Sequence, residues 1–153
     1  MASRIGYVGT ESAGDILTTT NFNKLPNGLI GYATATANQT GISSATDLTN
    51  LSVTVTVNTS RIIVIRANLF VLQNTSTANV TLAIKESTTQ LVQVNQNVVV
   101  STYGQLTPSV ILTPSAGSHT YKLTLSTSAG TVDLQAAATY PASIQVYDEG
   151  PSF

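Results

Sequence analysis

The sequence of 153 residues predicts an all-β protein, a jelly-roll-like β-sandwich of about eight to ten strands with an extended N-terminal arm. Three observations predict this fold: strict alternation of apolar and polar residues, turn-forming residues at short intervals, and no sustained helical period. The alternation is clearest at residues 51–57, LSVTVTV, where leucine and valines take one face and serine and threonines the other. It returns at residues 80–84, 121–125, 132–136 and 144–146.

Two further segments, residues 62–72 and 91–100, are apolar on both sides in places. Such strands are typical of the centre of a sheet or of a face that a partner covers, and their β-branched residues favour strand over helix. Turn-forming clusters separate the predicted strands, among them Asn27-Gly28, Pro114–Gly117 and Tyr140-Pro141. Short strands at this spacing indicate a sandwich or jelly roll of two packed sheets.

The N-terminal segment differs from the rest, because its apolar residues are isolated and follow no period. We therefore divide the chain into an N-terminal arm, residues 1–28, and a β-sandwich domain, residues 29–153. The arm has two interpretations. It is either an edge strand with a frayed terminus or an extended segment that lies on a neighbouring subunit, anchored by Ile5, Tyr7 and Phe22.

The composition favours a protein that assembles, although a merely tolerant polar surface is the alternative. Only 8% of the residues are charged, against about 25% in an average soluble domain, and the net charge is -1. Threonine, serine, asparagine and glutamine supply the polarity, so neighbouring copies do not repel each other. We expect no nucleic-acid partner, because no basic cluster is present, and no membrane span, because no apolar run is long enough. The start of the chain does not look like a signal peptide.

The single histidine, His119, is the first candidate for chemistry. A catalytic serine would have to contact it, but the adjacent Ser118 falls on the opposite face of the predicted strand. With no cysteine, no nucleophile elbow and no phosphate-binding glycine loop, we predict that the protein is not an enzyme. His119 shares its face with Tyr121 and Leu123, which predicts a hydrogen-bonded plug at the end of a sheet or a contact near an oligomer axis.

We predict no cofactor and no metal site. The alternative is a loop calcium site at Asp148 and Glu149, for which a solvated chain end is the favoured interpretation. Tyr32, Tyr103 and Tyr140 are candidates for stacking on sugar rings, but they lie far apart in the sequence.

Four segments carry a resemblance to a known family. They are LPNGLIGYATATANQTGI at 25–42, TDLTNLSVTVTV at 46–57 leading into RIIVI, AGSHTYKL at 116–123, and PASIQVYDEGP at 141–151. With these segments the chain resembles small structural proteins of tailed bacteriophages, notably those of actinobacterial hosts. The ending YDEGPSF departs from the family pattern, in which a more hydrophobic residue precedes the glycine.

The resemblance implies a jelly roll, sometimes like that of the tumour necrosis factor group, and commonly a trimer. It implies a virion structural protein, made in the host cytoplasm, that decorates the outer capsid shell as an oligomer and stabilises it. The expected partners are the major capsid protein and further copies of the chain itself, as a homotrimer. The alternative is a minor tail or tail-fibre module that binds host-surface glycans.

Overall fold

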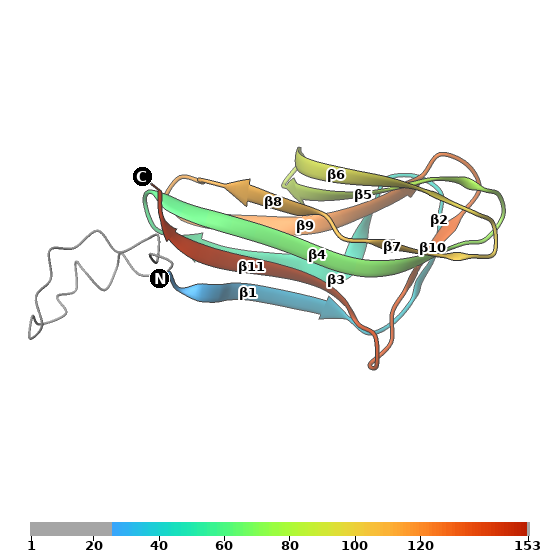
Figure 1. Cartoon of the computed structure of the whole chain (residues 1–153), viewed down its shortest axis with the longest axis horizontal. Helices are drawn as coiled ribbons and strands as arrows, with labels where there is room; N and C mark the ends of the chain where they lie inside the picture. The colour runs from blue at the N-terminus through green and yellow to red at the C-terminus, as the bar shows by residue number, and fades with distance from the viewer. Residues whose placement is uncertain (1–25, 153) are drawn as a thin grey trace, which may run out of the picture.

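The computed structural model describes residues 26–152, which form eleven strands in two antiparallel sheets packed face to face (Figure 1). The strands are β1 (Gly28–Ala35), β2 (Gln39–Ile42), β3 (Thr46–Val57), β4 (Arg61–Gln73), β5 (Ala78–Glu86), β6 (Thr89–Val98), β7 (Tyr103–Leu106), β8 (Ser109–Leu112), β9 (Gly117–Thr127), β10 (Val132–Gln135) and β11 (Ala142–Pro151). The predicted all-β fold is confirmed. The strand count exceeds the prediction because three long strands are interrupted.

The strand order is that of a jelly roll. One sheet, which we call the β4 sheet, runs β1-β11-β4-β10-β2, with β7 and β8 also paired to β4. The other, the β9 sheet, runs β3-β9-β5-β6. Three places in the β4 sheet are each filled by two short strands that follow each other along the same line. These pairs are β1 with β2, β7 with β8, and β10 with β11. Counting each pair as one strand leaves 11 − 3 = 8 strands, ordered 1-8-3-6 and 2-7-4-5, the double Greek key of a jelly roll.

β4 is the central strand, as the apolar run at residues 62–72 predicts. It pairs with β11 and β10 on one side and with β8 and β7 on the other. Its inward side chains, Ile63, Ile65, Leu69 and Val71, are fully buried and belong to the same core cluster as Leu123 of β9. The core therefore fills the layer between the two sheets, which pack about 10 Å apart in such folds.

Of the two interpretations of residues 91–100, the central strand is wrong, because β6 is an edge strand of the β9 sheet, whereas cover by a partner stays a prediction. Val92 and Val94 pack against the core, and Val98 is buried. The apolar residues that follow, Val99 and Val100, lie beyond the strand in an exposed turn. The run therefore looked apolar on both sides because it combines the end of an alternating strand with a turn.

Gly31 lets the β1 edge of the β4 sheet lie directly on β3. A methyl group at Gly31 would lie 2.5 Å from Val55 Cγ1 and 2.8 Å from Val53 Cγ2, which is closer than carbon atoms can approach. A larger residue would push β1 away from the core. This close packing fixes the position of the exposed side chains on the other side of β1.

Candidate functional site

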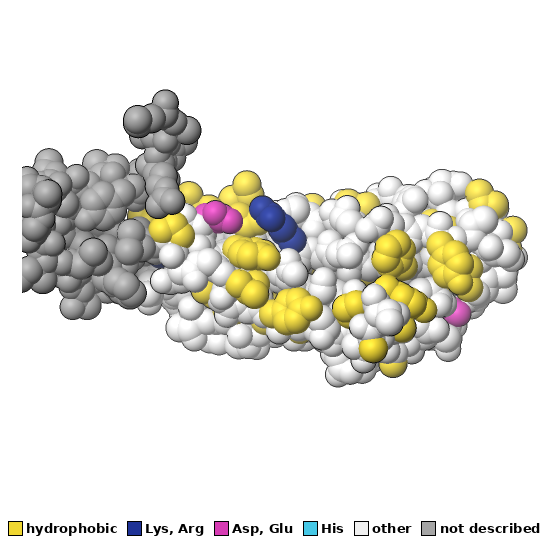
Figure 2. Space-filling model, turned by 60° about the horizontal axis from the view of Figure 1, so that its bottom comes forward, with side chains coloured by type: hydrophobic (Ala, Val, Ile, Leu, Met, Phe, Trp, Pro, Cys, Tyr) yellow, Lys and Arg dark blue, Asp and Glu magenta, His cyan; other side chains and the backbone are white. Residues whose placement is uncertain are grey.

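The outer face of the β4 sheet, which points away from the core, carries most of the large hydrophobic side chains that the structure exposes. Leu29, Tyr32, Tyr103 and Ile111 stand on its strands, and Tyr140 lies in the β10–β11 connection. In Figure 2, hydrophobic side chains gather in two groups on a surface with few charged groups. Outward side chains of neighbouring strands lie opposite each other, so they form rows across the sheet.

The first group is a continuous row of apolar side chains across four strands. The pairing places Ile111 of β8 opposite Val64 of β4, Val64 opposite Tyr147 of β11, and Tyr147 opposite Leu29 of β1. We call these four residues the apolar row. Its ends are open, with Ile111 70% and Leu29 52% exposed, whereas Val64 in the middle is 7% exposed. The row therefore exposes apolar side chains to solvent at both of its ends.

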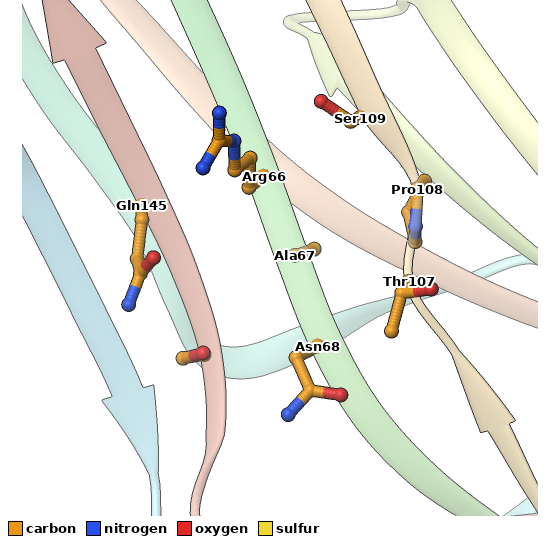
Figure 3. Close-up of a pocket in the computed structure, with 8 residues that line it drawn as sticks. Arg66, Ala67, Asn68, Thr107, Pro108, Ser109 and Gln145 are labelled. Carbon is orange, nitrogen blue, oxygen red and sulfur yellow. The ribbon is translucent and has the colours of Figure 1, made fainter.

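The middle of the outer face is a polar hollow of about 370 Å³. It forms where Thr107 and Pro108 interrupt the strand between β7 and β8, since proline has no N–H to donate to the ladder. The Pro108 carbonyl still accepts a hydrogen bond from Ala67 N at 3.0 Å. Figure 3 shows Arg66 on β4 flanked by Gln145 on β11 and by the β7–β8 segment on the other side.

Arg66 connects this hollow to the apolar row. Its guanidinium carbon lies 5.4 Å from the centre of the Tyr147 ring, which is a cation–π distance. Arg61, five positions earlier in the same strand, is buried, as opposite faces of a strand require.

Arg61 forms a buried ion pair with Asp148. Asp148 is one of the two residues at which the sequence analysis gave a calcium site as the alternative. Its Nη2 lies 2.7 Å from Asp148 Oδ1, and its Nε lies 2.9 and 3.0 Å from the two carboxylate oxygens. Asn27 Nδ2 and Gly150 N also donate to this carboxylate, at 2.7 and 3.0 Å. Glu149 is exposed and takes the other face. The Asp148 carboxylate therefore serves to join the start of β4 to the end of β11.

The second hydrophobic group consists of aromatic side chains that are far apart in the sequence. Phe70 of β4, Tyr103 of β7 and Tyr140 line a hollow of about 380 Å³ together with Gln135 of β10. We call these four residues the aromatic hollow. The sequence named Tyr103 and Tyr140 as candidates for sugar stacking but did not bring them together or add Phe70, because the strand order that unites them is not a local property. Tyr32, the third tyrosine considered for sugar stacking, does not line this hollow and stands opposite Gln145.

His119 lies at the core-facing side of β9 and is 9% exposed, whereas Ser118 is exposed. Its Nδ1 lies 2.6 Å from Glu86 Oε1, and its Nε2 lies 2.8 Å from the Ser115 carbonyl oxygen. Its ring stacks on Tyr121, with 6.1 Å between the ring centres. The histidine therefore connects β9, the loop before it and the end of β5.

Both hydrogen-bond partners of His119 are acceptors, so only the doubly protonated ring satisfies both. The bond to the Glu86 carboxylate, helped by the Ser115 carbonyl, raises the pKa of His119 above its ordinary 6.5, although burial opposes this. Burial also raises the pKa of Tyr121 to about 12. The doubly protonated His119 ring therefore forms a charged structural contact with Glu86 and Ser115.

Some predictions fall outside what the structure describes. Ile5, Tyr7, Phe22 and the arm up to residue 25 lie outside residues 26–152. Within the described part of the chain, no three acidic or histidine side chains gather as metal ligands. Within residues 26–152, no helix has the length and hydropathy needed to span a membrane.

No protein-family model matches the sequence, and no curated protein sequence matches it. Solved structures do match the fold. The Eiger TNF protein of S. frugiperda superposes with a TM-score of 0.51 and 11% identity, over 83% of this chain and 96% of that protein. This likeness to a TNF-type jelly roll agrees with the strand order derived above.

Two further structures match less closely. The insecticidal delta-endotoxin Cry8Ea1 of Bacillus thuringiensis has a TM-score of 0.43 and 13% identity, over 69% of this chain and 18% of the toxin. The T13 viral particle of IBDV has a TM-score of 0.43 and 10% identity, over 79% of this chain and 35% of that chain.

Proposed function

We propose that this protein is a structural subunit of a bacteriophage virion, a capsid decoration protein that associates with itself and binds the major capsid protein. The observation that carries the proposal is the apolar row, which crosses four strands of an outer face with little charge. The resemblance of the sequence to phage structural proteins supplies the virion context.

A second copy of the chain is the occupant that this face suits best. Leu29 and Ile111 stand exposed at the two ends of the row, and each buried apolar side chain stabilises an interface by about 25 cal/mol per Å². The chain has a net charge of -1, so copies approach without marked repulsion. A homotrimer is the assembly that the resemblance implies.

The arm supplies the second contact of the proposal, to the capsid shell or to a neighbouring subunit. Asn27 Nδ2 donates to the Asp148 carboxylate at 2.7 Å, so a residue at the end of the predicted arm contacts the sandwich. A deletion of residues 1–25 therefore removes most of the arm and leaves this hydrogen bond in place. Contacts of this kind across capsid subunits would have to break before the shell opens.

The copy number in purified particles tests the proposal. A decoration protein is present at a level comparable with the major capsid protein on a quantitative gel, whereas a tail component is present in a handful of copies. A handful would overturn the decoration role.

The arm is tested separately on particles that lack this protein. We expect the chain without residues 1–25 to fold, as judged by circular dichroism, and to fail to load. Full loading of the shortened chain would contradict the role of the arm.

A further inference from the structure

We propose that the aromatic hollow is a binding site for a neutral saccharide unit. Phe70, Tyr103 and Tyr140 surround it with Gln135, and its volume of about 380 Å³ lies within the range of small-molecule pockets, about 300–1,000 Å³. The Tyr103 side chain is 69% exposed and Tyr140 47% exposed, so two of the rings are accessible to a ligand.

The rings stand on hydrogen-bonded backbone. Phe70 lies in the middle of the sheet, opposite Gln105 of β7 and Gln135 of β10. Tyr103 lies opposite Leu72 at the start of β7. Tyr140 closes a tight turn, because its N–H donates to the Ala137 carbonyl at 3.1 Å and its carbonyl accepts from Ala137 N at 3.4 Å. A site carried on such elements loses little conformational entropy on binding.

The chemistry of the lining matches a pyranose ring. The electron-rich face of an aromatic ring attracts the C–H groups on the flat side of a sugar, and neighbouring amides bind its hydroxyl groups. Asn38 Nδ2 donates to Gln135 Oε1 at 3.2 Å, and Gln105 Nε2 donates to Asn68 Oδ1 at 2.9 Å. Of these amides, only Gln135 lines the hollow, and its amino group remains available for a hydroxyl group of a ligand.

The charges near the hollow favour a neutral ligand over a charged one. The four lining residues carry no charge. Asp133, which lies opposite Leu72 in the adjoining strand, accepts a hydrogen bond from Gly41 N at 2.7 Å. An acidic sugar or a phosphate would therefore meet no cation in the lining. A proline-rich peptide also stacks on aromatic rings, but it needs a groove that extends over several residues.

The proposal does not depend on where in a virion the subunit is placed, or on its self-association. The experiment is saturation-transfer NMR on the full chain with the methyl glycosides of galactose, glucose, mannose and N-acetylglucosamine. We expect binding of at least one of them, with saturation transferred to its ring C–H protons.

Three variants locate the site. Tyr103→Ala and Tyr140→Ala should each weaken binding at least about fivefold, since a stacked ring contributes on the order of 1 kcal/mol. Tyr32→Ala is the matched control, because it removes an exposed tyrosine of the same face outside the hollow, and it should bind as the wild type does. The monovalent probe makes the result insensitive to oligomeric state.

Several outcomes would overturn the proposal. The first is that none of the four glycosides binds, and the second is that Tyr32→Ala weakens glycoside binding as much as the two hollow variants do. The others are that sialyllactose binds more tightly than the neutral sugars, or that a proline-rich peptide binds and the sugars do not. An unchanged thermal midpoint of the Tyr103→Ala and Tyr140→Ala variants shows that lost binding is not lost folding.

Discussion

The outer faces of the two sheets carry different kinds of side chain. On the β9 sheet, outward polar groups bond to each other across strands: Thr54 and Thr120 hydroxyls lie 2.8 Å apart, and Thr81 Oγ1 donates to Asn95 Oδ1 at 2.5 Å. None of the exposed large hydrophobic residues in the described range lies on a strand of this sheet. On the β4 sheet, the outer face carries the apolar row and the aromatic hollow.

This difference supports a division of labour between the faces. On the β9 face, polar side chains satisfy one another by hydrogen bonds while exposed to water. Exposed apolar rows are costly in water and mark surfaces that other molecules cover. The β4 face is accordingly where we place self-association and ligand binding.

We expect the largest loss of stability when the buried ion pair of the β4 sheet is broken. Asp148→Asn should lower the free energy of unfolding by about 3–5 kcal/mol, because it leaves the buried Arg61 guanidinium without its carboxylate. Urea denaturation measures the change. A loss below about 1 kcal/mol would show that the pair does not hold β4 to β11.

The next effect tests which face carries the self-association. Ile111→Asp should raise the dissociation constant of the oligomer on the order of a hundredfold, because a charge is then buried without a partner. Thr56→Asp, an exposed strand position on the β9 face, is the matched control and should leave association unchanged. Sedimentation equilibrium distinguishes the outcomes. Equal dissociation of both variants, or a monomeric wild type, would contradict the assignment.

His119 should make the stability of the β9 sheet depend on pH. Its pKa in the folded state is raised above 6.5, so its contribution is fully present below pH 6.5 and is lost as the pH rises through the folded-state pKa. Relative to His119→Gln, the wild type should be more stable by about 1 kcal/mol at low pH.

The measurement for this prediction is urea denaturation of both proteins between about pH 5.5 and 9. The difference between them should shrink with rising pH. A constant or growing difference would show that the contacts to Glu86 and Ser115 do not require the charged ring.

The smallest effect is expected for the exposed ion pair of the β9 face. Lys122 Nζ lies 2.6 Å from Asp47 Oδ2, but the Asp47 side chain is 56% exposed. Lys122→Met should therefore change the free energy of unfolding by less than about 0.5 kcal/mol, as measured by urea denaturation. A loss as large as that of Asp148→Asn would remove the distinction between the two sheets.

Local pattern was enough to predict the strands and the side chains that face inward. Val53, Val55 and Leu123 are buried where the alternation placed them, and His119 shares their side of its strand. The edge position of β6 was not predictable, because an edge strand and a covered strand can carry the same local pattern. The role of the arm stays a prediction.

By itself, the sequence determined the all-β class, because the alternation with period two belongs to each strand separately. The tertiary structure alone decided which strands are neighbours. Arg61 and Asp148 are 87 positions apart, and the apolar row draws one residue from each of four strands. The aromatic hollow likewise joins Phe70 to Tyr140. Such surfaces arise from pairing between distant strands, and no property of a short segment specifies its partner.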